Sequence, residues 1–277
     1  MSSTEAPVSM GIPKSAARSP QTAGDHQLLE RGAAAGSQSA DDREGVNSSY
    51  LPVIALDGPS GTGKSTVAQA LARRLGLRYL DTGAMYRAAT VAVLDAGVEL
   101  DDAVAVATAV AGSDIQVSTD LADRNTYLGS RAVSQEIRGE AVTLAVSKVS
   151  AVPAVRAQLV AAQRDLIGSG GIVVEGRDIG SVVWPQAAPK IYLTADEEVR
   201  AQRRSRQLAK GDPIEAVRRD LERRDAFDSS RRTSPLTRTD DAVEVDTTYL
   251  SIDEVVNVLV DLCVNDRPIL SGPGRRG

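Results

Sequence analysis

Between residues 51 and 263, short apolar runs alternate with longer segments in which apolar residues recur at helical spacing. The apolar runs predict buried strands at 51–57, 172–175, 190–194 and 243–246. Residues 79–97 (YLDTGAMYRAATVAVLDAG) predict a short strand, a turn and a helix. The other periodic segments predict helices at 65–76, 101–112, 150–171, 196–211, 212–231 and 251–263.

Strands that alternate with helices favour a parallel sheet with helical crossover connections, so the predicted class is α/β. One region departs from this alternation. Residues 114–118 and 125–128 are typical of two short strands separated by polar DLADR, which indicates a hairpin. We therefore expect a doubly wound core with a parallel sheet and a small insert.

The two ends of the chain lack such a pattern. Residues 1–49 are rich in Ala, Ser, Gly and charge without a sustained period, which is typical of a disordered N-terminal tail. Residues 267–277 (RPILSGPGRRG) are rich in Gly and predict a C-terminal tail. We expect one ordered domain at 50–266.

Composition excludes several kinds of chemistry. The one histidine, His26, lies in the N-terminal segment, and the one cysteine, Cys263, rules out intrachain disulfides and multi-thiolate zinc sites. A net charge of −5 and an aromatic content of 3% do not fit a nucleic-acid polymer as partner. No apolar run is long enough to span a membrane and the first residues lack a signal-peptide pattern, so we expect a cytoplasmic protein.

Residues 58–65 (GPSGTGKS) match GxxxxGK[ST] between a predicted strand and a predicted helix. Glycines let the backbone wrap around phosphate oxygens, and the helix N-terminus adds unpaired amides and the positive end of its dipole. Lys64 would neutralise phosphate charge, and the Ser65 hydroxyl would ligate Mg²⁺. Triphosphate binding is thus predicted, while the reaction is not fixed. The predicted loop comprises Gly58, Pro59, Ser60, Gly61, Thr62, Gly63, Lys64, Ser65 and Thr66.

Transfer of a phosphoryl group to an anionic acceptor would need a second anion site, for which the planar fork of arginine is suited. Arg87 comes shortly after one predicted strand, and Arg177 and Asp178 follow another. In a parallel sheet, ligands bind beyond the carboxyl ends of the strands. We therefore expect both turns to open on the same side as the phosphate loop.

Further charged residues admit two interpretations. Arg224, Asp228 and Arg231 share one face if they are helical, but a solvated, ion-paired helix surface is equally compatible with them. Taken singly, four more residues are typical of a protein surface: Ser147, Arg156, Arg203 and Arg204.

Five segments in order along 50–263 resemble those of bacterial cytidylate kinases of the nucleoside-monophosphate kinase group: IALDGPSGTGKST, YLDTGAMYRA, VSAVPAVR, EGRDIGSVVWP and ERRDAFDSSRRTSPL. The resemblance implies a phosphate-loop (P-loop) kinase that transfers the γ-phosphoryl group of ATP to CMP in the presence of Mg²⁺. It also implies dCMP as a second acceptor, a monophosphate-binding insert at about 109–148 and an arginine-rich helical lid at about 197–212. We expect a monomer. Thr82 departs from the family's common Ser but keeps the hydroxyl.

The resemblance also implies roles for individual residues. The acceptor phosphate would be held by Arg87, Arg177 and Arg231. The cytosine would be surrounded by Thr82, Asp178, Arg156 and Arg231, and the ribose would be contacted by Ser147, Arg224 and Asp228. Closure over ATP would involve Arg203 and Arg204. The groups expected to act on the transferred phosphoryl group are Lys64, Arg87, Arg177 and Arg203.

General chemistry agrees with these roles. A carboxylate such as Asp178 can accept from the exocyclic amine of cytosine, where uracil presents a carbonyl. The second pKa of a monophosphate is about 6, so the acceptor is already anionic and needs no general base. Catalysis then reduces to in-line alignment, exclusion of water and neutralisation of charge.

Two alternatives remain open from the sequence. One is a phosphate-loop kinase for another acceptor, such as UMP or a small metabolite. The other is a nucleotide-dependent switch, although the sequence carries no guanine-reading NKxD motif. Rates with CMP, dCMP, UMP and AMP, together with ADP release with and without CMP, would distinguish them.

Overall fold

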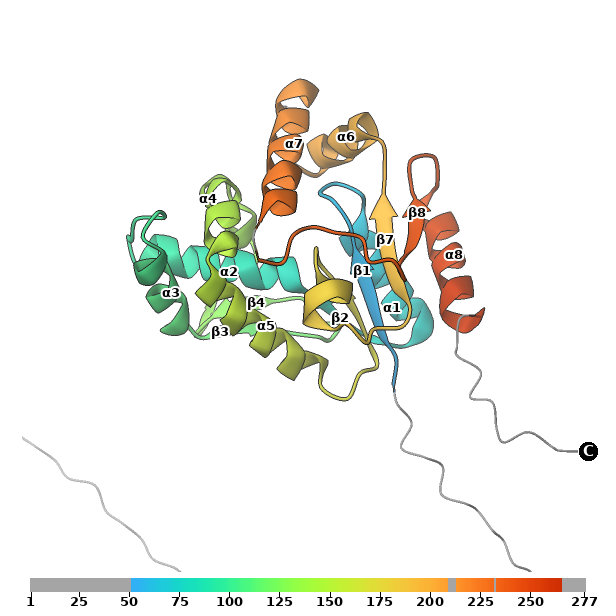
Figure 1. Cartoon of the computed structure of the whole chain (residues 1–277), viewed down its shortest axis with the longest axis horizontal. Helices are drawn as coiled ribbons and strands as arrows, with labels where there is room; N and C mark the ends of the chain where they lie inside the picture. The colour runs from blue at the N-terminus through green and yellow to red at the C-terminus, as the bar shows by residue number, and fades with distance from the viewer. Residues whose placement is uncertain (1–50, 209–212, 232, 266–277) are drawn as a thin grey trace, which may run out of the picture. The chain divides into compact units, whose positions relative to one another are not determined.

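The computed structural model describes residues 51–208, 213–231 and 233–265. At its centre is a five-stranded sheet in the order β2-β6-β1-β7-β8, with every neighbouring pair parallel (Figure 1). Four of these strands were predicted from apolar runs, and β2 was predicted from the pattern of residues 79–97. The expected tails, 1–49 and 267–277, lie outside the described residues. The strands are β1 (Val53–Asp57), β2 (Arg78–Asp81), β6 (Ile172–Glu175), β7 (Lys190–Thr194) and β8 (Val243–Asp246).

Helices cover both faces of the sheet because side chains alternate along β1. Ile54 and Leu56 pack with the helices of one face, and Val53 and Ala55 pack with those of the other. All four side chains are buried. The predicted parallel α/β core is therefore confirmed. One face carries α1 (Lys64–Leu75) and α8 (Ile252–Asn265), and the other carries α2 (Thr82–Asp95) and α5 (Pro153–Ile167).

The passage from β2 to α2 is shorter than the sequence suggested. No separate turn intervenes, because Asp81 ends the strand and also caps the helix. Its side chain accepts from the Ala84 N–H at 2.9 Å. Capping by an aspartate satisfies one of the amides that a helix N-terminus leaves unpaired. The side chains of the first helical turn thereby follow directly from the carboxyl end of the strand.

The helix predicted at 150–171 is wrong at its start. The structure has α4 (Glu140–Ala151) and α5 instead, separated by Val152 in an extended conformation. Proline disfavours the helical conformation in the residue before it, so Pro153 ends one helix and begins the next. Within the described ranges, no single helix is long and apolar enough to cross a membrane. Taken together, α4 and α5 meet that test by length and composition only, across a bend of 95°.

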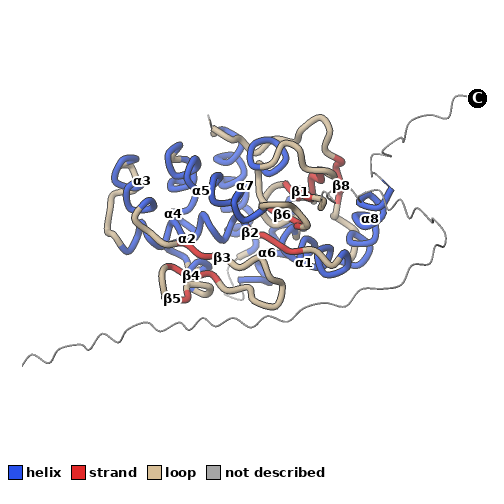
Figure 2. The backbone as a smooth tube through the Cα atoms, turned by 90° about the horizontal axis from the view of Figure 1, so that it is seen from below, coloured by secondary structure: helices blue, strands red, loops and turns tan. Residues whose placement is uncertain are grey.

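The predicted hairpin is confirmed and is part of a three-stranded antiparallel sheet beside α2, apart from β1 and β8 (Figure 2). Its third strand was not predicted. The small sheet packs on α2 through a separate apolar cluster that includes Val133 and Ile137. The elements of this region are α3 (Ala103–Ala111), β3 (Ile115–Val117), β4 (Thr126–Leu128), β5 (Arg131–Ala132) and the short helix η1 (Glu136–Arg138).

Two arginine-rich helices, α6 (Glu197–Leu208) and α7 (Ile214–Ser230), lie beyond the carboxyl ends of β1 and β7 (Figure 1). Both were predicted. Residues 209–212 of the expected lid lie outside the described residues. A short π-helix, η2 (Ile179–Val183), follows β6 and was not predicted.

Candidate active site

The phosphate loop connects β1 to α1, and its course depends on glycine. Gly58 has a φ of 142°, and a Cβ at this position would lie 2.2 Å from the carbonyl oxygen of Leu193. Gly63, with a φ of 92°, immediately precedes α1. The Lys64 ammonium group donates to the Pro59 carbonyl oxygen at 2.6 Å. The loop therefore wraps closely around its own lysine.

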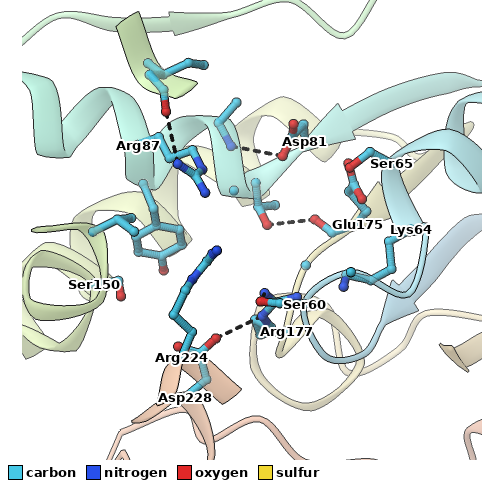
Figure 3. Close-up of a pocket in the computed structure, with 18 of the residues that line it drawn as sticks. Ser60, Lys64, Ser65, Asp81, Arg87, Ser150, Glu175, Arg177, Arg224 and Asp228 are labelled. Atoms are coloured by element: carbon cyan, nitrogen blue, oxygen red, sulfur yellow. Dashed lines mark hydrogen bonds and ion pairs between the residues drawn. The ribbon is translucent and has the colours of Figure 1, made fainter. Parts of the chain in front are cut away.

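A cavity of about 910 Å³ lies between this loop and the segments that follow β2 and β6. Figure 3 shows Lys64, Arg87, Arg177 and Arg224 around it. The structure brings most of the predicted site residues to its wall: Ser60, Gly61, Gly63, Lys64, Ser65, Thr66, Thr82, Arg87, Ser147, Arg156, Arg177, Asp178, Arg204, Arg224, Asp228 and Arg231. The predicted residues that do not line it are Gly58, Pro59, Thr62 and Arg203.

The Arg203 side chain does not line the cavity and is hydrogen-bonded to Thr247 instead. Its guanidinium group donates to the hydroxyl and carbonyl oxygens of Thr247 at 2.9 and 2.6 Å. Thr247 follows β8 and is buried. The expected lid arginine is thus attached to the loop after β8, next to the phosphate loop, where it also approaches the Thr62 carbonyl at 3.5 Å.

Arg87 and Arg224 are arginines of the cavity wall that have no carboxylate partner among the described residues. Arg87 of α2 donates to the Ile137 carbonyl at 3.1 Å, and neither it nor Arg224 of α7 forms an ion pair with any described carboxylate. Burial and neighbouring arginines lower the pKa of Arg87 to about 9 and that of Arg224 to about 10. Desolvated cations that repel one another make a site complementary to a multivalent anion.

Arg177 links the phosphate loop to α7. It donates to the Gly58 carbonyl at 2.7 Å, to the Ser60 hydroxyl at 2.5 Å and to Asp228 Oδ2 at 3.0 Å. Arg231 forms an ion pair with the other oxygen of Asp228. These contacts place Arg177 between the phosphate loop and α7.

The far end of the cavity is polar and buried. Arg156 of α5 forms an ion pair with Asp178 and lies over the Tyr86 ring, 5.2 Å from its centroid. The Thr82 hydroxyl donates to the Glu175 carbonyl oxygen at 2.7 Å, and Ser147 lines the same cavity. Charged and hydroxyl groups are therefore held where a base could be read by hydrogen bonds.

Sequence reasoning missed Glu175, the last residue of β6. Its side chain is buried, accepts a hydrogen bond from the Tyr79 hydroxyl, and lines the cavity next to Ser65. Burial and the nearby Asp81 carboxylate raise the pKa of Glu175 to about 7. Burial and Arg177 lower the pKa of Lys64. The sequence feature that could have identified Glu175 as a site residue is an acidic residue at the end of an apolar strand.

Asp57 was missed in the same way, at the end of β1. Its two carboxylate oxygens accept from the backbone N–H groups of Ile179 and Gly180 at 2.9 and 2.8 Å. Burial raises the pKa of Asp57 to about 6. The carboxylate therefore joins the strand that begins the phosphate loop to the segment that carries Arg177.

Comparison with known proteins gives further findings. A family profile described as cytidylate kinase matches residues 54–265. A cytidylate kinase of Rhodococcus opacus (strain B4) is 57% identical over 227 residues, which cover 80% of this chain and 97% of that protein. One of Nocardia farcinica (strain IFM 10152) is 57% identical over 211 residues, which cover 75% and 91%. A solved shikimate kinase from Acinetobacter baumannii aligns with a TM-score of 0.39 at 17% identity, over 79% of this chain and 96% of that chain.

Proposed function

Because the chain belongs to the cytidylate kinase family, it phosphorylates CMP with ATP, and we propose that the two cationic sets around its cavity hold the two substrates. One observation carries this proposal. Lys64 and the phosphate loop lie on one side of a single cavity, Arg87 and Arg224 lie on the other, and Arg177 contacts the loop while lining the same cavity (Figure 3). Two facing anion sites are what direct transfer between two phosphates requires.

On the donor side, the amides of the loop and of the α1 N-terminus would hold the ATP phosphates. Lys64 would leave its contact with Pro59 and neutralise charge on the transferred group. Arg203 and Arg204 of α6 would approach from the opposite side. Arg204 already lines the cavity, and Arg203 would have to exchange Thr247 for phosphate.

On the acceptor side, Arg87, Arg177 and Arg231 would hold the CMP phosphate in line with the donor. The phosphate needs no base because it is already ionised near neutral pH. The described part of the chain contains no histidine, in agreement with a reaction that depends on alignment and charge neutralisation.

Recognition of the nucleoside would lie at the buried end of the cavity. Asp178 would accept from the exocyclic amine of cytosine, with Arg156, Thr82 and Arg231 completing the base site. Uracil would place a carbonyl against that carboxylate, leaving polar groups unpaired. The ribose contacts would come from Ser147, Arg224 and Asp228, and dCMP would be a second acceptor.

The oxygen donors near the loop fit Mg²⁺. The Ser65 hydroxyl and the Glu175 carboxylate both line the cavity. Hydroxyl and carboxylate oxygens are the protein ligands that Mg²⁺ prefers. These two residues would hold the ion, which when bound neutralises phosphate charge.

We further propose that residues 109–148 form the insert that receives the monophosphate and that the described residues 197–208 belong to the lid. We also propose that the enzyme is monomeric and cytoplasmic and that it acts in pyrimidine nucleotide metabolism. Light scattering on a gel-filtration column would test the monomeric state, for which a dimer mass would be the contrary result.

An acceptor panel tests the site assignment. Steady-state rates with ATP and CMP, dCMP, UMP or AMP should give the highest kcat/KM for CMP, with dCMP next. Equal or higher kcat/KM for UMP would contradict the proposed base contacts and favour another acceptor. ADP release that is indifferent to CMP would instead indicate a nucleotide-dependent switch.

A further inference from the structure

Helices α6 and α7 are attached to the rest of the protein mainly by polar groups. Their own apolar cluster consists of Ala201, Val217 and Leu221 and is separate from the clusters that bury the central sheet. Apolar burial is the main source of folding stability. The folding of the central sheet therefore does not depend on the contacts that hold α6 and α7. The positions of the arginines on α6 and α7 do depend on those contacts.

Their contact with the phosphate loop is concentrated on Ser60. The Ser60 N–H donates to Asp225 Oδ1 of α7 at 2.9 Å, and the Ser60 carbonyl oxygen accepts from Arg200 of α6 at 3.1 Å. Arg200 and Asp225 form an ion pair with each other, and their side chains are only 8% and 15% exposed. One buried ion pair thus satisfies both backbone polar groups of a loop residue and joins the two helices.

The loop also approaches α6 very closely at the next residue. A Cβ on Gly61 would lie 3.1 Å from both the Cβ and the carbonyl oxygen of Arg200. The loop backbone therefore lies directly on the helix. A displacement of Arg200 would move the loop, or the helix would separate from it.

The ion pair is placed beside the arginines that the reaction would use. On α6, Arg203 and Arg204 come one turn after Arg200. On α7, Arg224 precedes Asp225 directly and Asp228 follows it within one turn. Because a helix is rigid over one turn, fixing Arg200 and Asp225 on Ser60 fixes these side chains relative to Lys64.

We infer that Arg200 and Asp225 are positioning residues for phosphoryl transfer, which hold the arginines of α6 and α7 in register with the phosphate loop through Ser60. The inference rests on the proposed binding of the donor phosphates at that loop. Neither residue lines the cavity, so neither is expected to touch substrate.

A purely structural ion pair would behave differently. Removing one partner of a buried ion pair leaves an uncompensated charge. If the pair were purely structural, this removal would lower the stability of the protein and leave kcat unchanged. A positioning pair would lower kcat in protein that is fully folded, because a misplacement of about 1 Å can cost 10²-fold in rate. It would also admit water beside the transferred group, so that some ATP is hydrolysed without forming CDP.

The test compares Asp225→Asn, Arg200→Met and the double variant with the wild-type chain. We expect kcat for CMP phosphorylation to fall roughly 10- to 100-fold in each, with KM for either nucleotide changed less than about threefold. The double variant should lose no more than the single ones, because the residues act as one unit. The ratio of ADP to CDP formed should rise above one.

The matched control is Glu222→Gln. Glu222 lies on the same helix one turn before Asp225, carries the same charge and pairs with Arg218 at 3.3 Å in an exposed position. Its variant should keep wild-type kcat and product ratio.

Two results would overturn the inference: kcat and the product ratio unchanged in both single variants, or a loss of activity that disappears when each is assayed well below its melting temperature. Lys64→Ala, assayed in parallel, separates this inference from the proposed donor site. Inactive Lys64→Ala beside normal Asp225→Asn rejects the positioning pair alone. Active Lys64→Ala rejects the donor site itself.

Discussion

Arg156 and Asp178 form an ion pair inside the protein, with 3% and 6% of their side chains exposed. The pair uses Asp178 Oδ2, and Oδ1 forms no hydrogen bond with the other described residues. Arg156 is fixed in turn by the Ser150 carbonyl at 3.3 Å and by the Tyr86 ring. The carboxylate proposed to read the base is therefore held in one orientation with one oxygen available.

Asp178→Asn should lower the preference for CMP over UMP. The amide keeps the shape of the side chain but can donate to the uracil carbonyl, so the ratio of the two kcat/KM values should fall roughly 10- to 100-fold. Loss of the charge also leaves Arg156 buried without its partner, which costs stability of the order of 3–5 kcal/mol. The rates must therefore be measured below the variant's melting temperature. Asp241→Asn, which removes an exposed partner of Lys190, is the control, and an unchanged CMP/UMP ratio in Asp178→Asn would contradict the assignment.

Lys64→Ala should reduce kcat by at least about 100-fold while leaving CMP affinity within a few-fold of wild type. The ammonium group would act on the transferred phosphoryl group, whereas Arg87 and Arg224, which would contact CMP, lie across the cavity (Figure 3). Steady-state rates measure kcat, and calorimetric titration with CMP measures the affinity for CMP separately. Lys148→Ala removes an exposed lysine paired with Asp101 and should change neither. Loss of CMP binding together with turnover would show that Lys64 belongs to the acceptor site.

The sequence was sufficient for features that depend on neighbouring residues. The phosphate loop could be predicted because its glycines, Lys64 and the flanking strand and helix are contiguous in sequence. Each strand of the large sheet was likewise predicted from the residues of its own short segment. Helix α4 was not predicted, and the helix of α5 was expected to begin at residue 150 because the apolar spacing of 150–171 extends to the N-terminal side of Pro153. Only the effect of Pro153 on Val152, which the structure shows as extended, separates the two helices.

Contacts between distant segments could not be predicted. Asp57 meets Ile179 across 122 residues of sequence, and Arg200 meets Ser60 across 140. Asp57 is a single aspartate at the end of a strand, and Arg200 is one of several arginines in its helix. The residues next to them in sequence do not indicate which distant residues they contact. The order of strands in the sheet has the same origin, since it depends on pairings that only the folded chain forms.

A chain that starts at residue 50 should keep the kinetics of the full chain. Every residue that lines the cavity lies between Ser60 and Arg231, and the family match begins at residue 54. Deleting 1–49 should therefore change kcat and both KM values by less than about twofold. A larger fall, measured at equal concentrations of active protein, would show that the N-terminal segment contributes to the reaction.

Asp57 should make stability depend on pH in an unusual direction for a carboxylate. Its pKa is raised from 3.8 to about 6 by burial, so the folded chain holds this proton more tightly than the unfolded chain does. The resulting contribution to stability is complete below about pH 4 and is lost as pH rises through about 6. Its size follows from the shift and is about 3 kcal/mol at most.

Asp57→Asn removes that titration and tests the sign. Urea unfolding of both proteins at pH 4.5 and pH 7.5 should show the difference in unfolding free energy moving in favour of the variant as pH rises. The asparagine amide cannot accept from both Ile179 and Gly180, so a constant penalty is expected beneath this trend. Asp101→Asn, which changes an exposed carboxylate, corrects for the general effect of removing a charge. A pH-independent difference, or one that moves in favour of the wild type, would mean that Asp57 stays ionised throughout and that its hydrogen bonds to the segment carrying Arg177 outweigh its burial.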